Sequence, residues 1–241
     1  MHSEIWPVTI VGVGAIGERI AKEIAQFHNF KQDNMILTLI DKDIYAPRNI
    51  ERQTFDALGN KAEVKTQELR SRYPHITIEP VAKYLNKKNV QAYVNEKMVV
   101  FSCVDNHVSR AILSQYCENL NNIVLINTGN EYYHGDAYMH MKIDGRTITK
   151  AFHEVHPEIL TSQERHPDDI GCEEAIVSAP QLGFVNYLVA GLALQLYYAW
   201  LQRDCWKQHP QLKLLCPPAN EIYADIIALK TRPVLHASLK N

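Results

Sequence analysis

The sequence has no excess of charge of one sign and no paired cysteines, and each absence excludes a class of protein. Its 25 Lys and Arg residues nearly balance 27 Asp and Glu residues, giving a net charge of -2. No bulk basic character therefore indicates a nucleic-acid partner. The five scattered cysteines include no CxxC pair, so we expect neither a zinc site nor a disulfide framework. This usage is typical of a reducing, cytoplasmic location.

The sequence also lacks the signals of a targeting peptide or a membrane-spanning segment. The first residues, Met1 to Glu4, are not followed by the basic and apolar segments of a signal peptide. No uninterrupted apolar run reaches the length that spans a bilayer, so we expect no membrane partner. The remaining composition is that of an ordinary folded protein, with 46% hydrophobic and 22% charged residues. A chain of 241 residues can bury a core without disulfides or metals.

A nucleotide-binding βαβ unit is the first motif that is present. An apolar run at residues 8–11 leads into Gly12-Val13-Gly14-Ala15-Ile16-Gly17, and a helical pattern follows. Gly12 permits the tight turn, Gly14 lets a phosphate approach the backbone, and Gly17 lets the helix pack close to the strand. The amides and the dipole of the helix start favour an anion there. This motif predicts a nucleotide but does not say which one.

The alternation of elements predicts an α/β fold: a Rossmann-like doubly wound, mostly parallel sheet with an antiparallel C-terminal extension. We expect one domain over residues 1–241, with a nucleotide-binding half at 8–130. The second half, 131–241, would hold an antiparallel hairpin, a crossover loop and a long helix. The expected strands are 7–11, 35–40, 76–78, 98–104, 123–126, a hairpin over 136–149 and a run at 221–229. The expected helices are 15–27, 61–72, 107–120 and 179–201, while 151–175 shows no clear period.

Polar groups follow several of these strands at the edge where open α/β sheets bind ligands. Asp41 and Asp43 follow the second strand, and Asp41 lies 24 residues after Gly17, where such folds place a ribose-binding carboxylate. Asp105 and Asn106 follow a later strand. Arg52 and Lys61 come shortly after the second strand, where a forked guanidinium and an ammonium could reach a polyphosphate.

In these residues the chain resembles the ThiF/MoeB adenylyltransferases, relatives of the ubiquitin-activating enzymes. The matching segments keep their order across residues 8–200. They are the glycine motif, Asp41-Lys42-Asp43, Asn49-Ile50-Glu51-Arg52-Gln53, Gly59-Asn60-Lys61-Ala62-Glu63, Asp105-Asn106 with Arg110, and Gly171-Cys172 continuing to Gly183. The chain departs from many family members in lacking zinc-binding CxxC pairs and in beginning almost at the first strand, without the N-terminal arginine that some dimeric members lend to their partner.

The resemblance implies roles for individual residues. Asp41 would hold the ribose of ATP, Arg52 and Lys61 the phosphates, and Asp105 Mg2+. The other nucleotide-site positions that it implies are Gly12, Gly14, Gly17, Asp43, Asn49, Gln53 and Asn106. The expected cofactors are thus ATP and Mg2+, without zinc. The expected partners are a small ubiquitin-fold carrier protein, usually ending in Gly-Gly, and a second copy of the chain.

The chemistry of the implied reaction suits these residues. The carboxylate at the end of the carrier attacks the α-phosphate of ATP and gives an acyl-adenylate and pyrophosphate. A terminal carboxyl has a pKa of about 3.5, so it is ionised at neutral pH and needs no general base. The reaction needs two anions brought into line, which calls for cations and positioning.

The fate of the activated carrier and two other functions stay open from the sequence. In ThiF-like members a cysteine near the position of Cys172, before the long helix, can take up the activated tail or take part in sulfur transfer, so Cys172 is a candidate catalytic residue. Glu173 and Glu174 beside it would raise the pKa of its thiol. An NAD-dependent oxidoreductase would use the same glycine turn and Asp41, but it would leave Arg52, Lys61 and Asp105 without a role. A catalytically degenerate scaffold subunit is the third possibility.

Overall fold

One continuous sheet organises the chain. The computed structural model describes residues 4–50, 53–131, 133–169, 183–202 and 221–225. Within them the strand order is β10-β8-β7-β6-β1-β2-β5, and β9 pairs with β8. The strands are β1 (Val8–Val11), β2 (Ile36–Ile40), β5 (Thr77–Val81), β6 (Met98–Ser102), β7 (Ile123–Asn130), β8 (His134–Ile143), β9 (Arg146–Thr147) and β10 (Glu221–Asp225).

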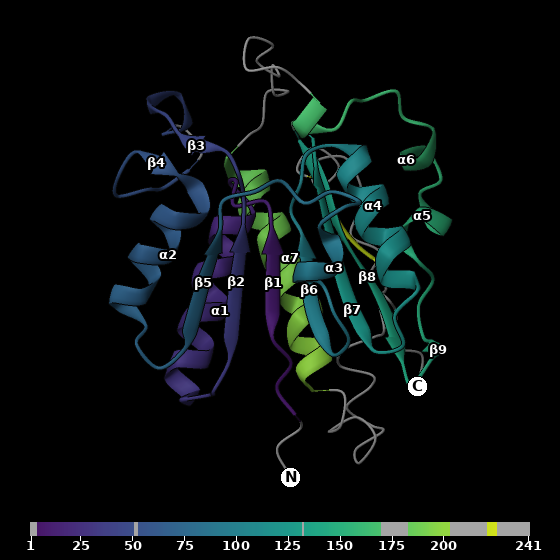
Figure 1. The fold of residues 1–241 in the computed structure, drawn as a ribbon, viewed down its shortest axis with the longest axis horizontal. Helices are drawn as coiled ribbons and strands as arrows, with labels where there is room; N and C mark the ends of the chain where they lie inside the picture. The colour runs from purple at the N-terminus through teal and green to yellow at the C-terminus, as the bar shows by residue number, and fades with distance from the viewer. Residues whose placement is uncertain (1–3, 51–52, 132, 170–182, 203–220, 226–241) are drawn as a thin grey trace, which may run out of the picture.

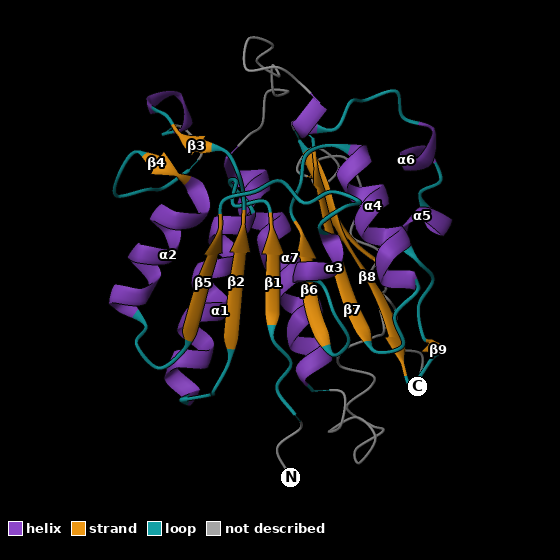
Figure 2. Cartoon of the chain, in the orientation of Figure 1, coloured by secondary structure: helices purple, strands orange, loops and turns teal. Residues whose placement is uncertain are grey.

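The sheet is parallel in its first half and antiparallel at one edge, as Figure 2 shows. Strands β5, β2, β1, β6 and β7 run parallel to one another, and β8 then pairs antiparallel with β7. β10 pairs antiparallel with β8, with Glu221 opposite Tyr138. This confirms the predicted doubly wound sheet with an antiparallel extension. Strands from both halves of the chain therefore share one sheet.

Helices cover both faces of the sheet (Figure 1). One core contains side chains of α1, α2 and α7, and the other contains side chains of α3 and α4. The helices are α1 (Gly17–Lys31), α2 (Lys61–Arg72), α3 (Val90–Tyr93), α4 (His107–Glu118), α5 (Phe152–Val155), α6 (Glu158–Thr161) and α7 (Gly183–Leu201). The single-turn helices α5 and α6 pack near α4.

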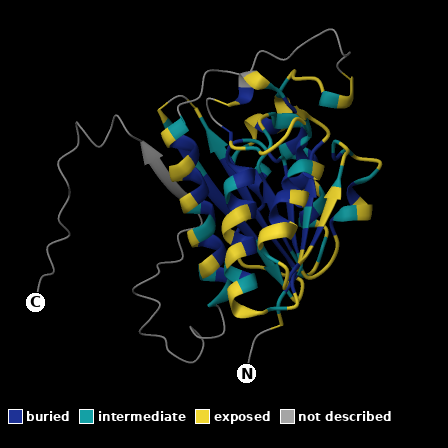
Figure 3. Ribbon diagram, turned by 90° about the vertical axis from the view of Figure 1, so that its left-hand side faces the viewer, coloured by how far each residue is buried: buried dark blue, intermediate teal, exposed yellow. Residues whose placement is uncertain are grey.

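Alternation along the central strands explains why two cores form. Ile10 belongs to the core under α1 and α7, and its neighbour Val11 belongs to the core under α3 and α4. Successive side chains of a strand point to opposite faces, so a strand covered on both faces must be apolar throughout. Figure 3 shows these buried strands enclosed by helices whose outward faces are exposed.

Two local features differ from the sequence prediction. The segment after Lys150 was expected to have no regular structure, but its described part forms α5, α6 and a 3-10 turn at Pro167–Asp169. A two-stranded sheet of β3 (Ile44–Tyr45) and β4 (Gly59–Asn60) was not predicted. Strands of two residues have no readable period, and their pairing is set by tertiary contacts.

Helix α7 is the most apolar helix that the structure describes. By length and composition alone, Gly183–Leu201 could cross a membrane, although Asn186 and Gln195 interrupt its apolar run. In the structure this helix packs against β7, β8 and α1. Its buried Val189 and Ala193 lie in the same core as Trp6 and Phe101, and its Trp200 ring lies 4.6 Å from that of Trp6. A helix that covers the middle of a sheet needs the same apolar composition.

Candidate functional site

The three glycines of the turn after β1 differ in whether the surrounding structure leaves room for a side chain. Gly12 has φ +92, and a Cβ on it would lie 2.5 Å from the carbonyl oxygen of Cys103. A Cβ on Gly17 would lie 1.9 Å from the carbonyl oxygen of Gly12, so close packing of α1 requires that glycine. At Gly14 the nearest atom to an added Cβ would be Nε2 of Gln53, at 3.9 Å. Gly14 is therefore the position of the turn with room for a ligand.

Asp41, at the end of β2, is tied to this turn. Its carboxylate accepts hydrogen bonds from the amide of Val13, at 2.6 Å, and from the amide of Asp43, at 2.8 Å. Burial raises the pKa of Asp41 to about 6, and the ammonium of Lys61 opposes that rise. The carboxylate thus lies against the glycine turn, where the sequence predicts a residue that binds ribose. Burial disfavours its ionised form.

Lys61, the first residue of α2, joins the same cluster. Its Nζ lies 3.0 Å from Oδ2 of Asp43, and the side chain is almost fully buried. The other oxygen of Asp43 accepts a hydrogen bond from the Tyr84 hydroxyl. Asn60 caps α2 by accepting from the amide of Glu63 and donates to the carbonyl oxygens of Asp41 and Asp43. These contacts fix the start of α2 to the segment that follows β2.

Asn49 and Gln53 lie in the segment between β3 and β4. Both are buried, and the amide of Gln53 donates to the carbonyl oxygen of Asn49 at 2.9 Å. The Asn49 side chain accepts from the amide of Ala46, which holds the turn. The Gln53 side chain lies beside Gly14, the glycine of the turn that has room for a ligand. Arg52 lies outside the described residues.

Asp105 and Asn106 follow β6 at the same sheet edge. Asp105 is exposed, so its carboxylate is accessible to a hydrated cation. Asn106 is the N-cap of α4, where its side chain accepts from the amide of Ser109 at 2.8 Å. Arg110 donates to the carbonyl oxygens of Val104 and Thr128, and burial lowers the pKa of its guanidinium. The structure therefore gives Asn106 a helix-capping contact, which the sequence analysis did not assign to it.

The thiols that the structure describes are not poised for nucleophilic attack. Burial raises the pKa of Cys103 to about 12, and burial also raises the pKa of Cys117. A thiol in this state carries almost no thiolate at neutral pH. Cys172 and its neighbours Glu173 and Glu174 lie outside the described residues.

Sequence reasoning missed the residues that line one side of the site. A pocket beyond the end of β5 is lined by Lys42, Ala82, Lys83, Tyr84, Asn86, Asn89 and Asp168. Asp168, far along the chain, accepts from Lys42 at 3.2 Å and from Asn86 at 2.7 Å. His166 contacts the carbonyl oxygen of Leu85 at 2.9 Å. The position of Tyr84 just after β5 was a usable signal, since the same edge rule applies to every strand of the sheet.

Comparison with known proteins places the chain among others of this architecture. The ThiF family profile matches residues 5–223. The molybdopterin-synthase adenylyltransferase of Escherichia coli (strain K12) is 25% identical over 193 residues, which are 78% of this chain and 72% of the relative. The SAMP-activating enzyme E1 of Haloferax volcanii is 29% identical over 114 residues, which are 46% of this chain and 40% of the relative.

A solved structure shares the fold. The complex of Escherichia coli MccB with ATP aligns with a TM-score of 0.61 at 18% identity. The alignment covers 82% of this chain and 55% of the MccB chain, so this chain spans little more than half the length of that neighbour. At this identity the likeness supports the fold alone.

Proposed function

This chain belongs to the ThiF family, and from that premise we propose that it is an ATP-dependent adenylyltransferase. Its substrate is the C-terminal carboxylate of a small ubiquitin-like or sulfur-carrier protein with a Gly-Gly end. The names of two relatives, an adenylyltransferase and an activating enzyme E1, support this class. A dinucleotide oxidoreductase on the same fold is the less favoured function.

One observation carries the proposal: Lys61 is a buried cation at the nucleotide edge of the sheet. Its charge acts on Asp41, and Asp41 in turn binds the amide of Val13 in the glycine turn. The ammonium therefore belongs to the same cluster as the turn where phosphates approach. Hydride transfer gives such a lysine no role, whereas phosphoryl-group chemistry depends on cations that offset the charge of the triphosphate.

The chain supplies positioning rather than a base. The carrier carboxylate attacks the α-phosphorus of ATP, a carboxylate O–P bond forms, and the bond to pyrophosphate breaks. Asp41 accepts from the ribose hydroxyls, Gly14 leaves room for the phosphates, and Lys61 neutralises them. We assign Arg52 to the phosphates on the resemblance alone. These roles bring two anions together, which is the main barrier to this reaction.

Asp105 would hold Mg2+ at this edge. Within the described residues no group of three His, Cys, Asp or Glu side chains is arranged to hold a metal. That pattern fits Mg2+, which takes one or two carboxylates, substrate phosphates and several waters instead of an all-protein cage. When bound, the ion would supply further neutralisation of the triphosphate. Transfer of the activated tail to Cys172, a homodimeric assembly and a cytoplasmic location are further parts of the proposal.

Calorimetric titration of the protein with ATP and Mg2+, set against NAD, tests the proposal first. We expect ATP to bind, NAD to bind at least about tenfold more weakly, and Asp105→Ala to weaken ATP binding about tenfold, by loss of a charged contact. A genomically linked ubiquitin-fold protein then serves as substrate in ATP–pyrophosphate exchange, which Lys61→Ala should abolish. Preferential binding of NAD, or full exchange by Lys61→Ala, would overturn the assignment.

A further inference from the structure

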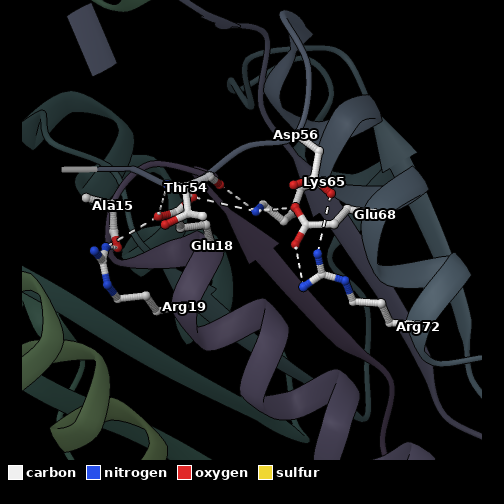
Figure 4. Close-up of polar contacts among 8 residues, drawn as sticks. All are labelled: Ala15, Glu18, Arg19, Thr54, Asp56, Lys65, Glu68 and Arg72. Carbon is white, nitrogen blue, oxygen red and sulfur yellow. Dashed lines mark hydrogen bonds and ion pairs between the residues drawn. The ribbon is translucent and has the colours of Figure 1, made fainter. Parts of the chain in front are cut away.

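A buried charge network begins beside the glycine turn, because its Glu18 directly follows Gly17 (Figure 4). Glu18 belongs to the first turn of α1, and Lys65 and Glu68 belong to α2; all three are buried, Glu18 and Lys65 to 3% exposure. Lys65 Nζ lies 2.7 Å from Glu68 and 3.7 Å from Glu18, and Arg72 lies 3.2 Å from Glu68. Burying such charges costs solvation energy that their attraction only partly offsets, so stability alone does not account for them.

The network forms hydrogen bonds to the backbone of one residue, Thr54, in the loop between β3 and β4. Both carboxylate oxygens of Glu18 accept from the amide of Thr54, at 2.9 and 3.1 Å. Lys65 Nζ donates to the carbonyl oxygen of the same residue at 2.7 Å. The N–H and C=O groups of Thr54 are thus held from two helices by groups of opposite charge. Charged partners make such hydrogen bonds stronger than neutral ones.

Thr54 follows Gln53, whose side chain lies beside Gly14. The loop from Gln53 to Leu58 has no helix or strand of its own. It is also held by the ring of Phe55, stacked 4.5 Å from Tyr45, and by Asp56, whose carboxylate lies 3.4 Å from Arg72. A hold on the Thr54 backbone therefore controls where Gln53 lies relative to the glycine turn. Lys65 also offsets the negative charge of Glu18, from which it lies 3.7 Å away.

We propose that Glu18 and Lys65 are positioning residues: they clamp the backbone of Thr54 from both sides and so hold Gln53 against the glycine turn for the phosphates of the nucleotide. This rests on the proposed function, because it takes the turn to be the phosphate site. Neither residue needs to touch the ligand. Their effect reaches it through the loop.

Hydrogen exchange of the Thr54 amide, together with calorimetric titration of the same proteins with ATP and Mg2+, tests this clamp. In Glu18→Gln one acceptor oxygen becomes a donor that faces Lys65 and the Thr54 amide. We expect this variant and Lys65→Met to exchange the Thr54 amide at least about tenfold faster and to bind ATP about tenfold more weakly. Glu23→Gln is the control, because Glu23 is exposed on α1 and lies outside the network, and it should match the wild type in both measurements.

A further variant keeps the proposal testable if either single variant fails to fold. Glu18→Leu combined with Lys65→Met and Glu68→Leu replaces the whole buried set by apolar groups of similar size, a change that buried ion pairs and triads commonly tolerate. This protein should fold and still show the fast Thr54 exchange. Unchanged exchange in the folded variants would overturn the clamp. Fast exchange with unchanged ATP affinity would overturn its role at the phosphate site. If the wild type binds no ATP, the proposed function fails, and the exchange data alone decide whether the clamp exists.

Discussion

Single glycines of the turn after β1 differ in what they tolerate. An added Cβ at Gly17 meets the Gly12 carbonyl oxygen at 1.9 Å, whereas one at Gly14 meets only ordinary contact distances. We expect Gly17→Ala to destabilise the fold by more than about 2 kcal/mol, because backbone must move. Gly14→Ala should leave the free energy of unfolding, measured in urea, within about 0.5 kcal/mol of the wild type, yet weaken ATP binding about tenfold. Equal stability of the two variants would contradict this division.

Asp41 predicts a pH dependence of stability. Burial raises its pKa to about 6, above the value of about 3.9 in an unfolded chain. The folded protein therefore binds the proton more tightly, and this contribution to stability is full below about pH 4 and lost as pH rises to about 6. Relative to Asp41→Asn, which does not titrate, the wild type should lose up to about 3 kcal/mol over that window.

Urea denaturation of both proteins at several pH values between 4 and 7 measures the difference. Parallel profiles would show that Asp41 titrates normally and that its burial carries no cost. A profile with the expected sign means that the folded protein holds a destabilising charge at this position. Such a charge is consistent with a carboxylate that accepts hydrogen bonds from the hydroxyl groups of a bound ligand.

At the scale of elements, two asparagines cap helices that reach the candidate site. Asn106 was predicted to bind the nucleotide, and the structure makes it the N-cap of α4. Asp is as good a cap as Asn, so Asn106→Asp should keep stability while Asn106→Ala should cost about 1 kcal/mol. If Asn106 serves only as a cap, the two variants will differ in thermal stability but will bind ATP with the same affinity. Weakened ATP binding in Asn106→Asp would instead support the predicted role, because a new carboxylate repels phosphates.

Elements with strong local signals were predictable from the sequence, and elements made by distant contacts were not. Helix α2 begins at Lys61 and ends at Arg72 as predicted, since Asn60 caps one end and Pro74 closes off the other. The strands buried on both faces were equally clear. By contrast, the clamp on Thr54 joins residues 36 and 11 positions away, and no local period encodes such contacts.

The candidate site follows the same division. The meeting of Asp41, Lys61 and the glycine turn was predictable, because the carboxyl ends of parallel strands share one edge. The same rule places Tyr84 at that edge, but not its hydrogen bond to Asp43, because that bond depends on the orientation of two side chains 41 residues apart. The contact of Asp168 with Lys42 spans 126 residues and depends on how the long segment after β9 returns to the sheet.

At the scale of the whole molecule, the outer side of α7 carries a regular exposed row. Phe184, Leu188, Gly191, Gln195 and Tyr198 are exposed and follow one another at spacings of four and three residues. This is the spacing by which one helix packs along another. Gly191 has open space where its Cβ would be, so a second backbone can come close there. The row supports the predicted homodimer, with α7 of one copy against α7 of the other.

Light scattering after size exclusion tests this assembly on the intact chain. We expect the wild type to have twice the 27.6 kDa mass of one chain. Leu188→Asp should raise the dissociation constant at least about a hundredfold, because a lone carboxylate in an apolar interface has no partner. Phe30→Asp is the control, since Phe30 is 87% exposed at the far end of α1, outside the row. A wild type that stays monomeric at micromolar concentration, or a Leu188→Asp protein that still dimerises, would show that this face of α7 is not the interface.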